Sequence, residues 1–252
     1  MDEILKKRIK PYSSKFKDWI IFEDDYLILI NKPKGITSLS ERNDPQSGLL
    51  ELAKKQYHKD LQLCHRLDKM TTGVLIFAKN PEVYRNISLQ FQKKQVKKIY
   101  WALVSGVHYY QDHEINLPFT LNANKIKVDF QNGKKATTIV NTIYNFKNYT
   151  LVECQPITGR THQIRVHLAL IKSPIVGDYE YGGQDLFLSE IKRNYKRSKK
   201  TETELSLNHS YLLHSRSIQF SHPHSQEIIH FEANLPENFK LCLDMLKKWN
   251  EY

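Results

Sequence analysis

The chain reads Cys64-His65-Arg66-Leu67-Asp68-Lys69-Met70-Thr71-Thr72-Gly73 and continues directly into Val74-Leu75-Ile76-Phe77-Ala78. The five apolar residues that follow Gly73 predict a buried strand. A rigid strand aims the residues at its entrance, so the carboxylate of Asp68 is better placed for chemistry than an acid on a helical surface. An ordinary alternative is that Asp68 caps the turn by accepting hydrogen bonds from the amides of Thr71 or Thr72.

Strand and helix patterns lie on both sides of this segment. Two apolar runs, 20–22 and 26–30, predict a β-hairpin. Asn80 followed by Pro81 predicts a helix that continues to about Gln95. The remaining expected elements are a helix over 48–57, strands over 99–104, 125–130, 136–146 and 149–154, a helix that opens in 158–168, strands near 211–220 and 226–232, and a helix over 239–249. Because strands outnumber helices and form hairpin-like pairs, we expect an α+β fold with a mixed, largely antiparallel sheet and flanking helices.

The chain is strongly basic. Its 252 residues include 38 Lys and Arg against 27 Asp and Glu, which gives a formal net charge of +11 at pH 7. The densest basic stretch runs from Lys192 to Lys200. Such a surplus favours a polyanionic partner, and nucleic acid is favoured over a membrane surface. The alternative is a basic surface that has no specific partner.

Other features argue against several kinds of protein. No apolar run approaches the roughly 20 residues that a membrane span requires, and the N-terminus lacks the layout of a signal peptide. Cys64, Cys154 and Cys242 lie far apart and form no CxxC pair, so we expect reduced thiols in a cytoplasmic protein. No HExxH motif is present, and His222 and His224 belong to an expected hairpin turn, so no metal site is expected.

Four segments look specialised: 31–35, 65–73, 98–100, and 159–167 followed by 174–178. Together they resemble the RluA-type family of RNA pseudouridine synthases, whose hallmark is HRLD followed by a Thr-Ser/Thr-Gly turn. Tyr181-Gly182-Gly183 and Leu213-His214 fit the same pattern. The resemblance runs from about Ile20 to Pro236. Two positions depart from it, since Thr72 stands where serine is commoner and Ser215 where alanine is usual.

The resemblance implies a pseudouridine synthase fold with a central RNA-binding catalytic cleft. The implied reaction isomerises uridine within RNA: the glycosidic bond to nitrogen 1 breaks, the uracil turns, and carbon 5 joins the same ribose carbon. This chemistry requires no metal and no cofactor. The catalytic domain is expected over 20–252, after a short N-terminal extension over 1–19.

The resemblance also assigns three catalytic residues. Asp68 matches the essential aspartate, which acts either by covalent attack or by proton abstraction from the ribose through a glycal; the sequence does not choose between these routes. Arg165 matches the arginine that pairs with this aspartate and keeps it ionised, a task that suits a bidentate guanidinium. Tyr100 matches the tyrosine expected to stack on the uracil.

The reaction also requires access to a stacked base, and enzymes of this kind take the base out of the stack. Arg66 matches the position proposed to fill the space that the flipped nucleotide leaves, although its ordinary role would be a phosphate contact. The further expected RNA-binding residues are His65, Lys32, Arg160 and Lys98, of which Lys32 and Arg160 are expected to contact phosphate or ribose. The expected base pocket consists of Thr72, Ile175 and Val176, with an apolar wall from Ile175 or Val176. Both His65 and Thr72 are expected to hold the turn in place rather than to react.

Only about 20 residues precede the first strand that matches the family, too few for a separate RNA-binding domain of the kind found in many relatives. The catalytic domain is therefore expected to find its RNA alone, which favours a compact stem-loop in rRNA or tRNA. A basic loop over 192–200 is expected to contact more distant RNA. We further expect a cytoplasmic monomer with no DNA or membrane partner.

Two other classes of protein are compatible with parts of this sequence. A catalytically inactive RNA-binding or ribosome-assembly protein on the same fold is the main alternative, but simple binding does not need an aspartate in a phosphate-rich cleft. A cysteine hydrolase that uses Cys64 is disfavoured, because residues adjacent in an extended segment point to opposite sides and Cys64 therefore points away from His65.

Overall fold

The computed structural model describes residues 15–40, 48–122, 125–195 and 204–251. The described chain divides into two compact units. The first unit takes the chain up to Ile99 together with His214–Leu235, and the second takes Tyr100–Leu213 together with the chain from Pro236 onward. The boundaries expected for a single catalytic domain, 20–252, stay a prediction.

The first unit is built around strand β4 (Thr72–Ala78), the strand predicted after the Asp68 turn. The strand order in this unit is β1 (Ile20–Glu23), β2 (Leu27–Lys32), β4 and β11 (Leu213–Ser221). In addition, β3 (Gln62–Leu63) pairs with β4, and β12 (Ile228–Glu232) pairs with β11. Strand β11 runs parallel to β4, whereas the other pairings are antiparallel. The predicted β1–β2 and β11–β12 hairpins are confirmed, and the sheet is mixed.

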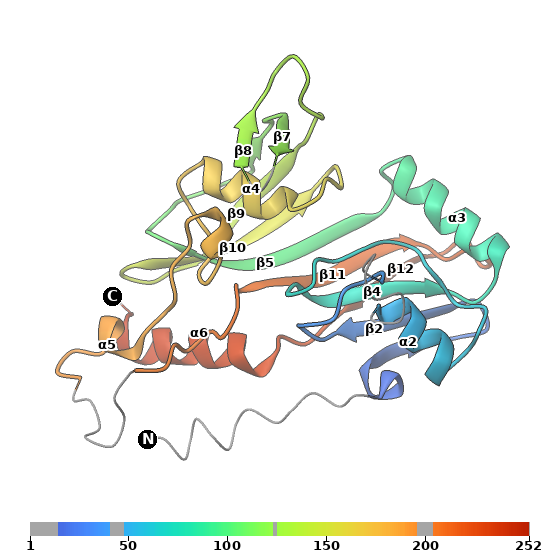
Figure 1. Cartoon of the computed structure of the whole chain (residues 1–252), viewed down its shortest axis with the longest axis horizontal. Helices are drawn as coiled ribbons and strands as arrows, with labels where there is room; N and C mark the ends of the chain where they lie inside the picture. Colours follow the sequence, from blue (N-terminus) through green and yellow to red (C-terminus); the bar gives the residue numbers. More distant parts are fainter. Residues whose placement is uncertain (1–14, 41–47, 123–124, 196–203, 252) are drawn as a thin grey trace. The chain divides into compact units, whose positions relative to one another are not determined.

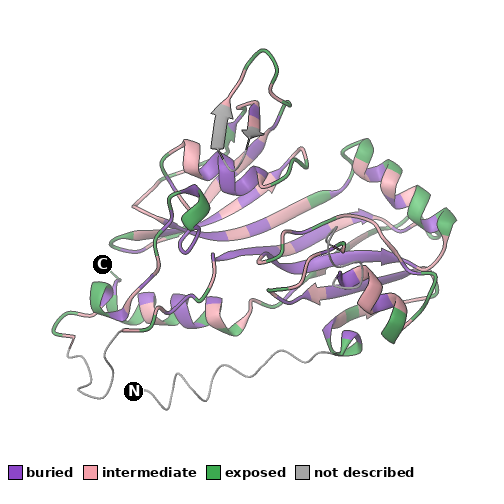
Figure 2. Cartoon of the chain, in the orientation of Figure 1, coloured by how far each residue is buried: buried purple, intermediate pink, exposed green. Residues whose placement is uncertain are grey.

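Every residue of β4 is buried, as Figure 2 shows. Val74 and Ile76 pack with Leu27 and Leu29 of β2 and with helix α3 (Pro81–Gln92). The predicted cap of α3 is confirmed, since Asn80 Oδ1 accepts a hydrogen bond from Val83 N at 2.9 Å. The helix ends before the expected Gln95 because Lys94 adopts a left-handed φ of 57°. The first unit also contains a 3₁₀ helix, η1 (Phe16–Trp19), and helix α2 (Leu49–Gln56).

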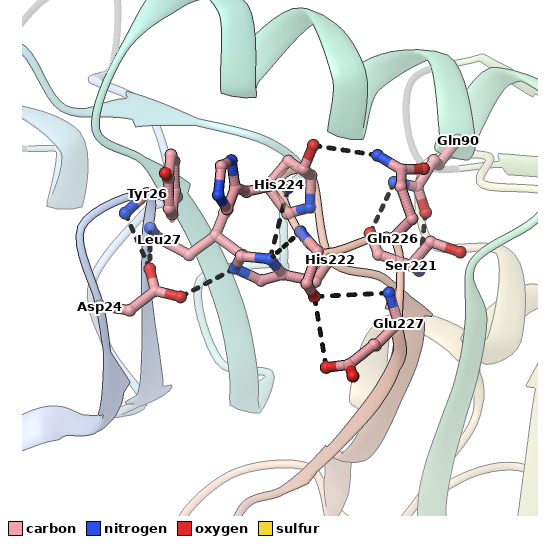
Figure 3. A network of polar contacts seen from close by, with 11 residues as sticks. Asp24, Tyr26, Leu27, Gln90, Ser221, His222, His224, Gln226 and Glu227 are labelled. Atoms are coloured by element: carbon pink, nitrogen blue, oxygen red, sulfur yellow. Dashed lines mark hydrogen bonds and ion pairs between the residues drawn. The ribbon is translucent and has the colours of Figure 1, made fainter.

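In the first unit, the turns of its two hairpins are tied together by an Asp–His pair (Figure 3). Asp24 Oδ1 accepts hydrogen bonds from the amides of Tyr26 and Leu27 at 2.8 and 2.7 Å. Asp24 Oδ2 lies 2.8 Å from His222 Nε2, while His222 Nδ1 accepts from the amide of Ser225 at 3.1 Å. Since Nδ1 is an acceptor, the proton is assigned to Nε2. His222 therefore joins two turns that lie nearly 200 residues apart in sequence.

The second unit has a sheet in the order β5 (Lys97–Ser105), β10 (Tyr149–Pro156), β9 (Thr138–Asn145) and β6 (His113–Ile115), with every pairing antiparallel. Helix α4 (Gln163–Leu170) packs on β9 and β10, and α5 (Leu188–Ile191) packs against α6 (Glu237–Trp249), as Figure 1 shows. A short helix, η2 (Tyr179–Tyr181), follows α4. Strands and helices in both units confirm the predicted α+β class.

The structure contains three short strands that were not expected from the sequence, β3, β6 and β7 (Phe119–Asn122). The strand expected over 125–130 is one arm of a small hairpin, β7 and β8 (Lys125–Val128). The short strands β3 and β6 were not predicted, because two or three residues carry no periodicity. Helix α4 opens within the expected segment 158–168 and starts at Gln163, because His162 adopts a left-handed φ of 54° that a helix cannot include.

No helix in these described ranges is long and apolar enough to cross a membrane. Of the basic stretch Lys192–Lys200, the structure describes residues 192–195, and the rest lies outside the described residues.

Candidate active site

The turn that carries Asp68 is held on its N-terminal side by Ser38. The Ser38 hydroxyl donates to Leu67 O at 2.6 Å and accepts from Leu67 N at 2.9 Å. Both Ser38 and Leu67 are buried, whereas Asp68 is half-buried and Arg66 is exposed. The backbone directly before Asp68 therefore has little freedom.

The C-terminal side of the same turn is held by Lys32, at the end of β2. Its side chain is 0% exposed, and its ammonium donates to Pro33 O at 2.9 Å, Lys69 O at 3.1 Å and Thr71 O at 2.9 Å. Burial lowers the pKa of Lys32 to about 7, although the nearby negative charge of Asp68 opposes the shift. An ammonium has three N–H groups, and three carbonyls accept them, so the structure places Lys32 inside the turn rather than at a surface where a phosphate could reach it.

His65 attaches the turn to the middle of β4. Its Nε2 accepts a hydrogen bond from Ile76 N at 3.2 Å, next to the backbone bond from Cys64 N to Ile76 O at 3.0 Å. Burial and the charge of Lys98 lower the pKa of His65 to about 3, so the ring stays neutral and remains an acceptor. This arrangement agrees with the expectation that His65 holds the turn. Lys98 packs its ammonium 5.9 Å from the Phe91 ring centroid, beside His65.

Thr72 and Gly73 join β4 closely to β11. The Thr72 hydroxyl lies 2.7 Å from His214 Nδ1, and His214 Nε2 lies 3.2 Å from Ala233 O. A carbonyl only accepts, so Nε2 carries the proton and Thr72 donates to Nδ1. Gly73 has a φ of +113°, and a Cβ there would come within 2.1 Å of Ser215 O. Only glycine allows this approach, which explains the Thr-Gly pair that follows the catalytic turn.

The remaining predicted site residues belong to the second unit. Tyr100 is nearly buried on β5, opposite Cys154 of β10. Ile175 and Val176 are buried, and Val176 N donates to Leu103 O of β5 at 2.9 Å. Arg160 is exposed, and its Nε donates to Lys135 O at 3.1 Å. Their roles toward the base and the RNA stay predictions.

Arg165 extends from α4 into a cluster of acids and tyrosines. Its Nε and Nη2 donate to the two carboxylate oxygens of Asp178, both at 2.7 Å, and Nη2 also donates to Glu180 at 2.7 Å. Burial alone would lower the pKa of Arg165, but the hydrogen bond to Asp178 and the neighbouring negative charges raise it, so the guanidinium stays charged. The pairing of Arg165 with Asp68 stays a prediction, since the two residues belong to different units.

Sequence reasoning missed Ser38, His214 and Glu180, and it gave Asp178 no role although Asp178 closes one of the recognised segments. Ser38 lies 29 residues from Leu67, and Asp178 lies 13 residues from Arg165. No periodic pattern links residues at such separations. Only Asp178, an unassigned acid inside a recognised segment, and His214, in the Leu213-His214 match, left a signal in the sequence.

Comparisons with known proteins agree with these motifs. A family model described as RNA pseudouridylate synthase matches residues 26–170. Ribosomal large subunit pseudouridine synthase C of Buchnera aphidicola subsp. Baizongia pistaciae (strain Bp) is 37% identical over 239 residues, 92% of this chain and 71% of that protein. The protein of the same name from Escherichia coli (strain K12) is 33% identical over 251 residues, 96% of this chain and 75% of its own. The solved structure of human RNA Pseudouridylate Synthase Domain Containing 4 matches with a TM-score of 0.69 and 29% identity, covering 92% of this chain and 94% of that one.

Proposed function

The chain belongs to the RNA pseudouridylate synthase family, and from this premise we propose that its substrate is the RNA of the large ribosomal subunit. The protein is an isomerase that converts uridine to pseudouridine within RNA. Support for the ribosomal target comes from relatives named for the large subunit, which match over 92% and 96% of this chain. Transfer RNA is the alternative target.

The observation that carries the catalytic assignment is the double brace around Asp68. Ser38 holds the residue before it, and Lys32 holds the two carbonyls that follow it. We assign Lys32 this positioning role in place of a phosphate contact. An aspartate whose backbone is held on both sides suits both possible routes, covalent attack and proton abstraction, because each depends on near-attack geometry at the ribose.

Tyr100 and Arg165 complete the proposed chemistry. Tyr100 offers an aromatic face to the uracil, and its position on a paired strand limits its motion. Arg165 supplies a permanent positive charge for the reacting carboxylate. Ile175 and Val176 form the proposed apolar wall of the base pocket. These assignments rest on the family motifs, residue by residue.

Arg66 is the proposed group that replaces the flipped nucleotide. Its exposed side chain follows His65 and precedes buried Leu67, so the guanidinium projects from an anchored backbone. A planar guanidinium can stack on the bases that remain.

Arg160 and Lys98 are the proposed contacts to the RNA backbone. Because ribosomes are made in the cytoplasm of bacteria, the proposal also places this protein there, as a monomer that binds neither DNA nor membranes.

The test compares two transcripts, large-subunit rRNA and a tRNA mixture, each incubated with the purified protein without added cofactor. We expect pseudouridine at defined positions of the rRNA and none in the tRNA. Asp68→Asn should bind the rRNA and form no pseudouridine, whereas Asp60→Asn, which changes an exposed acid of the same unit, should match wild type. Modification of tRNA alone would replace the proposed substrate. Absence of pseudouridine in both transcripts would overturn the proposed function.

A further inference from the structure

Arg165 is a buried cation that is paired with two carboxylates. Its side chain is 5% exposed, and two carboxylates bind the same guanidinium. One of them, Asp178, is 1% exposed and makes a side-on pair that uses both of its oxygens. Burying a charge is costly unless it is paired and hydrogen-bonded, and the carboxylate of Asp178 meets this requirement through Arg165.

The second carboxylate differs from the first. Glu180 is 28% exposed, and it binds only Nη2 of Arg165. Its other oxygen lies 3.7 Å from Nδ1 of His162, the residue that precedes α4. Burial favours the neutral acid, but the hydrogen bond and charge of Arg165 lower the pKa of Glu180, so it stays ionised. Glu180 is therefore the more adjustable of the two partners.

Two tyrosine rings restrict the same guanidinium. Its central carbon lies 4.6 Å from the ring centroid of Tyr181 and 4.5 Å from that of Tyr211. Such contacts favour a flat, immobile guanidinium. Tyr181 is itself held, since its hydroxyl lies 2.6 Å from His162 Nδ1. The second unit thus orients Arg165 by hydrogen bonds along one edge and by aromatic rings against its plane.

We propose that Asp178 is the principal positioning residue for Arg165 in the isomerisation reaction, and that Glu180 is a secondary one. The inference rests on the proposed function, because it gives Arg165 a role in catalysis. An arginine side chain that is already immobile loses little further entropy when the reacting carboxylate and the ribose approach it. Removing Asp178 should therefore slow the reaction without weakening the binding of RNA.

The test uses Asp178→Asn, Glu180→Gln and, as a matched control, Asp185→Asn. Asp185 lies in the same segment and accepts a hydrogen bond from Asn208 Nδ2 at 2.6 Å, so its substitution perturbs the loop without touching Arg165. Rates are measured with transcribed large-subunit rRNA and expressed per RNA-binding site, which stoichiometric titration counts. This correction removes the contribution of any misfolded fraction.

We expect kcat to fall about 100-fold in Asp178→Asn and about tenfold in Glu180→Gln, with KM changed less than about threefold in both, because each substitution weakens a charged hydrogen bond to Arg165. Asp185→Asn should keep the wild-type kcat. If Asp178→Asn binds no RNA, the test rests on kcat of Glu180→Gln, which should be lower than kcat of Asp185→Asn.

Equal losses in the control and in the Arg165 partners would overturn the proposal, as would a kcat within twofold of wild type in both partner variants. A wild type that forms pseudouridine while the variants keep its rate overturns only the positioning role. A wild type that forms none overturns the proposed function instead, so the two failures are distinguishable.

Discussion

The hydroxyl of Ser38 binds both backbone groups of Leu67, donating to its carbonyl at 2.6 Å and accepting from its amide at 2.9 Å. This single side chain takes the place of a neighbouring strand at the residue before Asp68. The end of β2 and the loop after it therefore both hold the Asp68 turn, through Lys32 and through Ser38. In the recognised segment 31–35, Lys32 contributes three hydrogen bonds to this bracing.

Ser38→Ala should lower the free energy of unfolding by about 1–3 kcal/mol, because it leaves the amide and carbonyl of Leu67 buried without their partner. The rate of the reaction should fall as well, since the backbone before Asp68 is released. Chemical denaturation and single-turnover rates measure the two effects. Ser40→Ala is the control, because the buried Ser40 hydroxyl has no hydrogen-bond partner among the described residues. Equal destabilisation by both substitutions would contradict the bracing role of Ser38.

Local patterns were sufficient for most of the fold. The apolar run after Gly73 predicted β4, and Asn80 with Pro81 predicted the start of α3. The segment 158–168 predicted that a helix opens there but not its first residue, Gln163, because the left-handed backbone of His162 and the hydrogen bond from Arg160 N to the Gln163 side chain at 3.0 Å leave no periodic signal.

The partners of the site residues could be predicted far less well. Lys32 carries a charge, and charge at the surface of an RNA-binding protein normally indicates a phosphate contact. Its burial depends on β2 lying beside β4, with Lys32 opposite Gly73. The pairing of Arg165 with Asp178 likewise depends on how the chain folds back after α4. Long-range register, rather than residue type, determines both roles.

Asp24→Asn should destabilise the first unit by about 1 kcal/mol at neutral pH, because the amide of asparagine accepts less strongly than a carboxylate from His222 and the turn amides. Burial favours the neutral acid, but hydrogen bonds from Leu27, Tyr26 and His222 lower the pKa of Asp24 below its ordinary value of 3.8. The unfolded chain therefore takes up this proton first as the pH falls, so the contribution is present above pH 4 and disappears below it.

Thermal unfolding at pH 7 and at about pH 3 checks this prediction, and Asp25→Asn, an exposed neighbour, is the control. The gap between wild type and Asp24→Asn should narrow on acidification. A gap that widens would contradict the contribution assigned to the Asp24 carboxylate.

The affinity of the protein for RNA should fall steeply with salt, by about 10³-fold between 50 and 200 mM if roughly six phosphates are neutralised. Arg66→Ala separates its two possible roles. A phosphate contact would reduce the slope of log affinity against log salt by about one, whereas a residue that fills the space of a flipped base should leave the slope unchanged and slow the reaction. Filter binding at several salt concentrations measures the slope, with exposed Arg85→Ala as the control. We expect an unchanged slope and a lower rate.

Lys32→Met should change how stability depends on pH. Burial lowers the pKa of Lys32 from 10.5 to about 7 in the folded protein, so between these values the unfolded chain binds more protons than the folded one. Stability then rises with pH across this window, by about 1 kcal/mol per pH unit where the difference approaches a full proton. It is lowest below about pH 7, where the folded and the unfolded chain both bind the proton.

Denaturant unfolding from pH 6 to pH 10 measures this effect as the difference between wild type and Lys32→Met. The difference should be smallest near pH 6, where the buried ammonium opposes folding most, and should grow in favour of wild type up to pH 10. Lys55→Met, on the exposed side of α2, controls for the loss of a lysine as such. A difference that stays constant with pH would show that the three carbonyls outweigh burial and keep Lys32 charged. Lys32 would then hold the Asp68 turn as an ammonium up to pH 10, and deprotonation of Lys32 would not lower the rate of the reaction in that range.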